Sequence, residues 1–428
     1  MLSLLSWAIA QSPQRLEAWA VRFGDGGCGV VYFDAPPGAT VLFAVGPPEN
    51  APPPSSFVAA ALGASRVALA FTAPSESVFL QMPTASGGGD VLEVRPAEAA
   101  GAALVDDVLV RPDGWTACAV HATPQAAIDA AADGSRVLVA PGTWRGDGNC
   151  GLRFKGRSVS VEGLAGAART VLDCEGDAAR GSGVAFVDGE GSGASLRGIS
   201  VVNAAGGATG GGALRIGPAA DGRPSSPTIL DCVFADSAAP SGGGASIGGG
   251  SARLTDVTFA RNRATAGGGG GVDVQAAEAA GADVTFESVV VVNNTAEADA
   301  AGAGGGAGVR VGGGSSLRLS GGRVAGNRAA WATARFCAGG CAPAPQDGGG
   351  LLIGGGATAT VDGAAVEDNE CDGAGGGVRV GSGGSRLTMG GGSLSANRAA
   401  EGGGLSAYES PLFPRCYTAA AASGGEAL

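Results

Sequence analysis

The stretch FARNRATAGGGGGVDV, from Phe259 to Val274, joins two short signals that recur along the second half of the chain. The first signal is an apolar residue followed three positions later by Asn or Ser, as in Phe259 and Asn262. The second is a glycine cluster that leads into a short run of β-forming residues, as in Gly270 to Val274. Recurrence of a fixed pair of signals indicates a repeat architecture, in which each repeat stacks on the next one.

The copies of the two signals are unevenly spaced. Glycine-led runs lie at 211–216, 243–247, 270–274, 307–311, 349–353, 376–380 and 403–407. The apolar signals end at Ser237, Asn262, Asn294, Asn327, Asn369 and Asn397, which are 25, 32, 33, 42 and 28 residues apart in turn. This variation predicts a constant core into which loops of different length are inserted.

A third β-run lies between the two signals, for example at 316–319 and 385–388. Three short strands and three turns per repeat predict an all-β fold, a right-handed parallel β-helix with three strands per coil. The alternation in Val309-Arg310-Val311 and in Val378-Arg379-Val380 predicts that these valines are buried and these arginines are exposed.

The repeat asparagines are expected to be structural. Asn tolerates the left-handed backbone conformation of a turn, and its amide can bond to the Asn of the next coil. The residues concerned are Asn262, Asn294, Asn327, Asn369 and Asn397.

The part of the chain before the repeats has a different character. Short β-runs broken by proline-rich turns predict a small β-rich domain. From Thr123 to Gly134, an N-cap Thr, a Pro at the first helical position and a closing Gly predict one short helix, which can cover the open end of the β-helix and shield its first unpaired strand. The expected divisions are a degenerate signal peptide at 1–14, the small domain at 15–118, the β-helix at 119–415 and a flexible tail at 416–428.

Composition excludes several classes of partner. The 81 Gly and 22 Pro among 428 residues approach the composition of disorder, but a hydrophobic fraction of 45% favours a folded chain. With 27 basic against 39 acidic residues and a single Lys, Lys155, nucleic acid and anionic membranes are excluded as partners. No apolar run is long enough to form a transmembrane segment, and we expect no cofactor. Nine Cys without a CxxC pair favour an oxidising location, extracellular or at the cell surface.

Two pairs of cysteines are disulfide candidates. Cys150 and Cys174 fall in consecutive strands of the first coils, so their sulfurs are expected to lie close enough to bond. Cys337 and Cys341 are candidates for a staple within a long inserted loop, with Cys371 as a competitor.

Two outward-facing carboxylates are the weak candidates for a metal site. Asp231 and Asp256 stand six residues before the repeat Ser or Asn of adjacent coils, so they are expected to lie one coil rise apart. The same column continues as Ser288, Gly321, Gly363 and Gly391. Because Asp, Ser and Gly are the usual residues of turns, the column is interpreted as structural, and the cation site is the less favoured alternative.

Three further polar residues have a simple interpretation. Asp273 beside Arg310, in the outward column of the glycine-led strands, predicts a surface ion pair that contributes about 0 to 1 kcal/mol. His121 has no obvious partner in the sequence and is interpreted as a surface histidine. Asn293 begins the one usable acceptor sequence for N-glycosylation. No residue is assigned a catalytic role.

The sequence resembles two known groups of proteins. Residues 123–134, 137–144 and 170–174 resemble the first coils of the pectin-lyase-like superfamily. The repeats resemble the middle region of the polymorphic outer membrane protein adhesins, whose signatures are GGA before an aliphatic residue and F-x-x-N. GGAL at 211–214 matches the first signature, and FARN at 259–262 matches the second. These resemblances imply a β-helix over about two thirds of the chain, and they are much less specific for activity.

Two functional hypotheses remain. The first is a secreted or cell-surface β-helix that acts as a non-catalytic scaffold for adhesion or for binding glycans or proteins. The alternative is a carbohydrate-active enzyme, either a polysaccharide lyase or a glycoside hydrolase, which the resemblance implies would need several carboxylates together on one face. Because no register of the repeats offers such a cluster, the scaffold is favoured, with a polysaccharide or a surface protein as its partner.

Overall fold

The computed structural model describes nine strands between residues 18 and 105, and beyond them residues 119–276, 281–297, 305–330 and 347–407. The chain divides into two compact units. The first comprises Met1–Ala102 and Val108–Ala119, and the second comprises Ala103–Asp107 and Val120–Leu428. The signal peptide expected at 1–14 and the tail expected at 416–428 lie outside the described residues. No helix among the described residues is long and apolar enough to cross a membrane.

The first unit contains two four-stranded sheets, which are mostly antiparallel. In one sheet, β1 (Ala18–Phe23) pairs with β2 (Cys28–Asp34) and, in parallel, with β8 (Ala97–Ala99), while β2 also pairs with β5 (Arg66–Thr72). In the other sheet, β3 (Thr40–Gly46) pairs with β4 (Val58–Ala61) and β6 (Ser77–Gln81), and β6 pairs with β7 (Val91–Val94).

A short helix lies at the start of the second unit. In α1 (Pro124–Ala130), Thr123 Oγ1 accepts a hydrogen bond from the Ala126 N–H at 3.2 Å, as expected of an N-cap. Pro124 stands in the first turn, where its missing N–H costs no hydrogen bond. The helix ends at Ala130, before the expected Gly134, and it buries Ala127 and Ile128.

The first strand after the helix is not an unpaired edge. β11 (Arg136–Val139) pairs in parallel with β9 (Ala103–Val105), and β9 pairs in turn with β10 (Val120–His121). The expectation that the helix shields an unpaired β11 is therefore wrong. A strand that precedes the expected boundary at 119 extends this sheet, and α1 contacts β9, β10 and β11 beside it.

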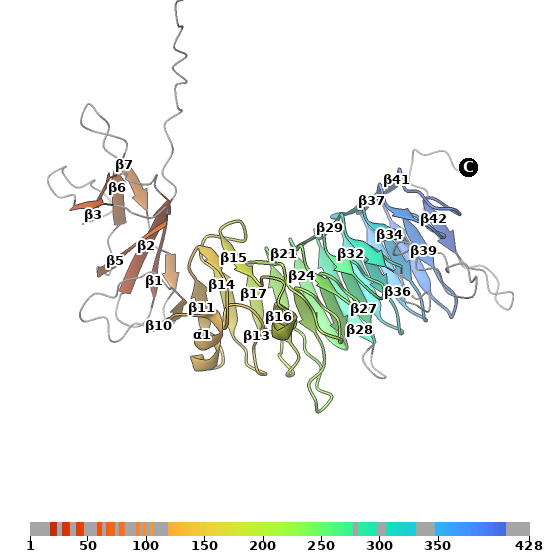
Figure 1. Ribbon diagram of the computed structural model, residues 1–428, viewed down its shortest axis with the longest axis horizontal. Coiled ribbons are helices and arrows are strands. Elements are labelled where there is room, and N and C mark those ends of the chain that lie inside the picture. Colours follow the sequence, from red (N-terminus) through yellow and green to blue (C-terminus); the bar gives the residue numbers. More distant parts are fainter. Residues whose placement is uncertain are drawn as a thin grey trace, which may run out of the picture. The chain divides into compact units, whose positions relative to one another are not determined.

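Three long parallel sheets form the coils, and each strand pairs with its counterpart one coil later (Figure 1). The first sheet continues from β11 through β14 (Ser160–Gly163), β17 (Ser195–Arg197), β20 (Thr228–Leu230), β24 (Gly250–Thr255), β28 (Ala282–Glu287), β32 (Ser316–Ser320), β36 (Thr358–Asp362) and β40 (Arg386–Gly390). The second contains β12 (Gly142–Trp144), β15 (Thr170–Asp173), β18 (Ser200–Val202), β21 (Val233–Ala235), β25 (Thr258–Ala260), β29 (Val290–Val292), β33 (Arg323–Ala325), β37 (Ala365–Glu367) and β41 (Ser393–Ser395). The third contains β13 (Leu152–Arg153), β16 (Val184–Phe186), β19 (Leu214–Ile216), β23 (Ala245–Gly248), β27 (Val272–Gln275), β31 (Val309–Val311), β35 (Leu351–Ile353), β39 (Val378–Val380) and β42 (Leu405–Ala407). The predicted parallel β-helix is confirmed.

A fourth, shorter sheet accompanies the three predicted ones. It contains β22 (Ala238–Ala239), β26 (Arg263–Ala264), β30 (Thr295–Glu297), β34 (Arg328–Ala330) and β38 (Glu370–Cys371). Each of these strands directly follows the repeat Ser or Asn of its coil. Strands of two or three residues are too short to show a period-2 pattern, so the sequence did not predict them.

Inward side chains stack in columns that fill the β-helix. Phe234 and Phe259 are register partners in the second sheet, and their ring centroids lie 5.2 Å apart. Phe286 packs against this pair from β28 of the first sheet, with its ring centroid 6.4 Å from that of Phe259. Stacking of this kind buries apolar area continuously along the solenoid, so no coil has a separate core.

The predicted alternation of inward valines and outward arginines holds in the third sheet, but the expected burial fails for Val380 and the expected exposure fails for both arginines. Val309, Val311 and Val378 are buried, as expected. Val380, two coils later than Val311, is half-buried. The side chains of Arg310 and Arg379 are only 24% and 16% exposed, because each lies against a carboxylate on the outer face.

The repeat asparagines form a ladder at the corner after the second sheet. Asn294 donates from its backbone N–H and from Nδ2 to Oδ1 of Asn327, both at 2.9 Å, and from Nδ2 to the Phe259 carbonyl at 3.0 Å. The amide-to-amide bonds link Asn262, Asn294, Asn327, Asn369 and Asn397 in turn. The ladder thus ties each corner to the next one.

The left-handed conformation belongs to the residue before each ladder position and not, as expected, to the asparagine itself. These preceding residues are Asp236, Arg261, Asn293, Gly326, Asp368 and Ala396, with φ between 53° and 63°. This turn directs the following side chain inward, so that its amide can reach the next coil.

Candidate functional site

The aligned carboxylates Asp231 and Asp256 lie at the corner between the first and second sheets. Every member of their column has positive φ, from 51° at Asp231 to 78° at Gly391. Asp231 is paired with Arg197, with Nε 3.2 Å from Oδ2, and Asp256 is exposed. The geometry of this column is that of a left-handed turn, for which Asp and Gly are suited. Among the described residues, no group of three or more His, Cys, Asp or Glu is placed to hold a metal ion.

Asp273 and Arg310 are adjacent in register on the third sheet, but they are not a surface pair. Arg310 Nε and Nη2 donate to the two carboxylate oxygens of Asp273 at 2.8 and 2.7 Å. The Asp273 side chain is only 3% exposed. The glycine segment before the strand lies against both residues of the pair, since a Cβ on Gly269 would be 2.7 Å from Cβ of Asp273 and one on Gly268 would be 2.5 Å from Cδ of Arg310. The predicted energy of a solvent-exposed pair therefore does not apply here.

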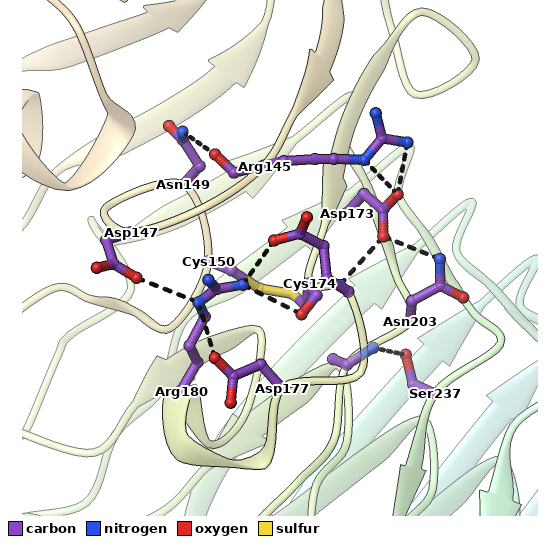
Figure 2. The surroundings of a disulfide bond; sticks show 12 residues. Arg145, Asp147, Asn149, Cys150, Asp173, Cys174, Asp177, Arg180, Asn203 and Ser237 are labelled. Atoms are coloured by element: carbon purple, nitrogen blue, oxygen red, sulfur yellow. Dashed lines mark hydrogen bonds and ion pairs between the residues drawn. A yellow bond between two sulfur atoms is a disulfide. The ribbon is translucent and has the colours of Figure 1, made fainter.

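The first coils hold a cluster of charged and polar residues that surrounds a disulfide (Figure 2). Cys150 and Cys174 are bonded, with their Cα atoms 5.5 Å apart, which confirms the predicted pair. The Arg180 guanidinium lies beside this bond and approaches three carboxylates, at 3.4 Å for Asp147, 3.0 Å for Glu175 and 3.4 Å for Asp177. The hydrogen bond with Glu175 is the main reason that the pKa of Arg180 is raised.

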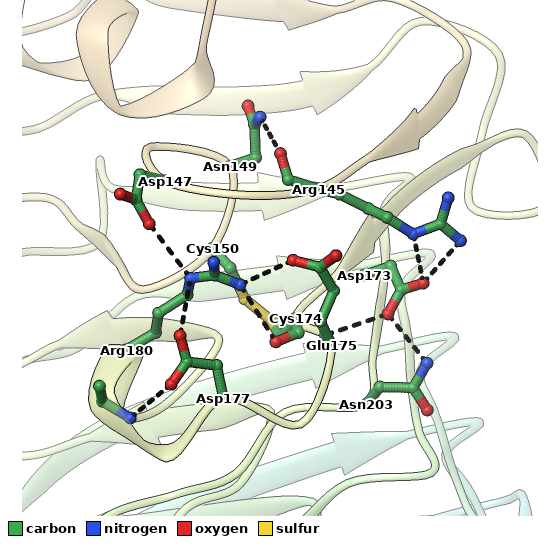
Figure 3. Close-up of polar contacts among 11 residues, drawn as sticks. Arg145, Asp147, Asn149, Cys150, Asp173, Cys174, Glu175, Asp177, Arg180 and Asn203 are labelled. Atoms are coloured by element: carbon green, nitrogen blue, oxygen red, sulfur yellow. Dashed lines mark hydrogen bonds and ion pairs between the residues drawn. A yellow bond between two sulfur atoms is a disulfide. The ribbon is translucent and has the colours of Figure 1, made fainter.

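A second arginine lies on the other side of the disulfide (Figure 3). Arg145 Nη2 is 2.8 Å from Oδ2 of Asp173, and Asn203 Nδ2 donates to Oδ1 of the same carboxylate at 2.9 Å. Burial acts to raise the pKa of Asp173, but the hydrogen bonds from Asn203, the Glu175 N–H and Arg145 outweigh it and lower that pKa below its usual value. Asp173 is therefore a stable anion that links three coils.

The charges in the cluster around the disulfide indicate a structural role. Arg180 already occupies the space between three carboxylates, so its cation neutralises the charge that a metal ion would otherwise balance. Asp173 holds its negative charge against burial, which is the opposite of what a general acid requires. The arrangement fixes the loops of the first coils through ion pairs and hydrogen bonds.

Glu190, which no motif in the sequence singles out, lies in the loop after β16 and is fully buried. Its Oε1 accepts the Gly156 N–H at 3.0 Å, and its Oε2 accepts the Asp188 N–H at 2.9 Å and the Ser225 hydroxyl at 3.0 Å. The donors come from three successive coils, so the carboxylate of Glu190 holds the loops of these coils together. Its neighbours in the sequence, GEGSG, have the composition of an exposed loop and carry no signal of burial.

The remaining predicted residues do not gather at one place. Cys337 and Cys341 lie outside the described residues, while Cys371 is a buried free thiol. Burial raises the pKa of Cys371, and it raises that of the second free thiol, Cys232, to about 12. Asn293 is exposed at a left-handed corner, and His121 is half-buried in β10.

Many carboxylates on the outer faces pair with an arginine of a neighbouring coil. Glu162 lies 3.0 Å from Arg136, and Glu287 and Glu297 each lie 2.6 Å from an arginine. The other pairs of this kind include Arg153–Asp188, Arg261–Asp236, Arg323–Glu367 and Arg379–Asp347. Charge on the outer faces is thus largely balanced between coils.

Comparisons with known proteins add little to this geometry. No family model matches the sequence, and no match is found among characterised proteins. Among solved structures, the chain is similar to the family 28 exopolygalacturonase of Yersinia enterocolitica, with 10% identity, a TM-score of 0.23, and coverage of 92% of this chain and 99% of that one. An identity of 10% and a TM-score of 0.23 are too low to indicate a shared function. The strand pairing itself shows what this chain is, namely a parallel β-helix.

Proposed function

We propose that the chain is a secreted or cell-surface β-helix that binds glycans or proteins along its outer faces without cleaving them. The observation that carries this proposal is the pairing of outer-face carboxylates with arginines of neighbouring coils, as in Arg253–Glu287 and Arg310–Asp273. The oxygens of a paired carboxylate are already engaged as acceptors. Such a group is poorly suited to donate a proton to a glycosidic oxygen or to attack a sugar.

The directions in which the pKa values of the carboxyl groups are shifted support the proposal. The acid of a glycosidase needs a pKa raised towards neutrality. Among the described carboxyl groups, those whose pKa clearly departs from the usual value are Asp129, Asp173 and Asp221, and all three are lowered. Hydrogen bonds are the main lowering cause in each case, from Lys155 at Asp129 and from Arg223 at Asp221.

The disulfide and the repeat signatures bear on location and partner. The Cys150–Cys174 bond supports an extracellular or cell-surface location, because such bonds persist in oxidising compartments. The residues that match the adhesin signatures have packing roles, since Leu214 and Phe259 are buried and Asn262 belongs to the ladder. The adhesin resemblance therefore supports a scaffold, with a polysaccharide or a surface protein as the proposed partner.

Incubation with pectate and alginate, with and without added Ca²⁺, tests the proposal. We expect no unsaturated products that absorb in the ultraviolet and no new reducing ends, together with retention on an immobilised polysaccharide. Asp231→Asn and Asp256→Asn are matched variants, because Asn accepts the left-handed conformation at both positions. Release of products that either substitution abolishes would establish the alternative, a polysaccharide lyase or glycoside hydrolase.

A further inference from the structure

The outward column of the third sheet is rich in arginine. In register order it runs Arg153, Ala185, Arg215, Ser246, Asp273, Arg310, Leu352, Arg379 and Ser406. Three of the arginines are bound to carboxylates: Arg153 to Asp188 at 2.8 Å, Arg310 to Asp273 at 2.7 Å, and Arg379 to Asp347 at 3.3 Å. Each of these cations therefore has its charge balanced within the chain.

Arg215 differs from the other three. It is half-buried, and within the described part of the chain no hydrogen bond or ion pair engages its guanidinium group. Burial lowers the pKa of Arg215, and the positive charge of Arg153 lowers it further. Removing a cation from water without a partner is unfavourable, so this position costs stability that the fold does not recover from its own residues.

Arg153 and Arg215 lie on either side of Ala185 in the same column. Neighbouring strands are about 4.8 Å apart, so the two arginine backbones are separated by about 10 Å. Ala185, between them in the outward column, is only 7% exposed, whereas the Arg153 side chain is 48% exposed. With Asp188 bound to Arg153, the two arginines and one carboxylate leave a net charge of about +1 over Ala185.

We infer that Arg215, together with Arg153, binds an oxyanion group of an acidic glycan above Ala185. A guanidinium presents a planar fork of N–H donors that matches a carboxylate or sulfate group. Ser246, next to Arg215 in register, adds a hydroxyl group to the same face. The inference rests on the proposed glycan-binding function, and it assigns that function an anionic ligand and a place on the third sheet.

The overall negative charge of the chain restricts where an acidic polymer can bind. A net charge of −12 repels an acidic polymer from the surface as a whole. Binding therefore depends on a local excess of positive charge, and the unpaired Arg215 supplies it. Since the contact is electrostatic, affinity should fall as salt is added.

Calorimetric titration of the full chain tests the inference with three probes: an oligogalacturonate, dextran sulfate and neutral dextran of similar length. We expect binding of at least one anionic probe, no binding of neutral dextran, and a loss of affinity of at least about tenfold in Arg215→Met. Arg318→Met is the matched control, because Arg318 is an exposed arginine on β32 with no partner among the described residues. Its affinity should stay within about twofold of the parent protein.

The outcomes separate the source of the anion from the site itself. Binding of the oligogalacturonate alone identifies a uronate carboxylate, and binding of dextran sulfate alone identifies a sulfate ester. Equal affinity in Arg215→Met, or no binding of either anion, overturns the inference. In that event, retention of the protein on a neutral polysaccharide would still support the proposed scaffold function.

The stability of the same variant distinguishes a ligand-binding arginine from a structural one. Without ligand, Arg215→Met should have an unchanged or higher melting temperature, because it removes an unpaired half-buried charge. A lower melting temperature would show that Arg215 supports the fold and would contradict the inference. Arg215→Lys keeps the charge but loses the planar fork, so its affinity should lie between those of the parent and Arg215→Met.

Discussion

One ladder asparagine, Asn327, connects three coils through the hydrogen bonds of its side-chain amide. Asn327 Nδ2 donates to Asn369 Oδ1 and to the Val291 carbonyl, each at 2.9 Å. Its Oδ1 accepts both the backbone N–H and the Nδ2 of Asn294. These bonds need a side chain with both a carbonyl oxygen and an NH2 group, because Asn327 accepts from the preceding coil and donates to both neighbouring coils.

We expect Asn327→Ala to lower the free energy of unfolding by about 2 to 4 kcal/mol, since it leaves buried groups of Asn294 and Val291 without partners. Urea unfolding followed by circular dichroism measures the change. Asn293→Gly is the matched control, because Asn293 is exposed and its positive φ suits glycine, and it should change stability by less than about 1 kcal/mol. A loss in Asn327→Ala no larger than in this control would contradict the role of the ladder.

The Asp273–Arg310 pair makes a second prediction at the scale of single residues. Asp273→Asn keeps the size of the side chain but leaves Arg310 half-buried without a counter-charge, which should cost about 2 to 3 kcal/mol. Asp236→Asn is the control, because its partner Arg261 is 59% exposed, and it should cost less than about 1 kcal/mol. Equal losses in the two variants would show that burial does not strengthen the pair.

The sequence predicted which residues alternate but not how deeply their outer members are covered. The period-2 pattern placed Val309 and Val311 inward, because side chains on a strand point to opposite faces. It treated Arg310 as exposed, since the pattern describes only the strand that carries it. The glycine segment that covers Arg310 comes from a different coil, so the strand that carries Arg310 gives no sign of it.

At the scale of elements, the disulfide joins the loop after β12 to the residue after β15. It closes a separation of 24 residues, for which the loss of chain entropy in the unfolded state suggests a stabilisation of about 3 kcal/mol. We expect Cys150→Ser/Cys174→Ser to lower the melting temperature, and a reductant to lower that of the parent but not that of the double variant. A response of the double variant to reductant would place the effect at another bond.

The link between β12, β15 and β18 through Asp173 should depend on pH. Because the folded-state pKa of Asp173 is lowered, its contribution to stability is fully present above the unfolded value near 3.8 and is lost as pH falls through the folded value. The difference in melting temperature between the parent and Asp173→Asn should therefore be constant at higher pH and shrink below about pH 3.8. A difference that persists unchanged into strong acid would show that the charge of Asp173 is not its source.

The composition of the fourth sheet explains why the sequence did not predict it. Its inward positions are Ala264, Ala296 and Ala329, together with Cys371. Alanine is not favoured in strands, and each of these strands directly follows the ladder corner of its own coil. The positions of the ladder asparagines could be predicted from their spacing, whereas the short strands depend on coils that the local sequence does not describe.

At the scale of the molecule, the coils share one continuous core and one set of ladders. Each coil contacts its neighbours, so stability is a sum over coils and the interfaces between them. The loops differ in length, but the residues that pair from coil to coil keep a fixed register. The sequence could therefore predict the stacked repeat, while ligand and partner depend on the outer faces, where no repeat is required.

Removal of one whole coil tests this additivity. Deleting residues 238–262 joins Ser237 to Arg263, which replaces Ala238 by its register equivalent and brings the Asn294 ladder position next to Ser237. We expect this protein to fold with the same ellipticity per residue and a moderately lower melting temperature, because every remaining strand still has a neighbour in register. Deleting only residues 238–249 removes β22 and β23 but keeps β24 and β25, so the third sheet loses its continuity and the chain should aggregate or fail to fold. Equal behaviour of the two deletions would mean that register between coils does not hold the β-helix together.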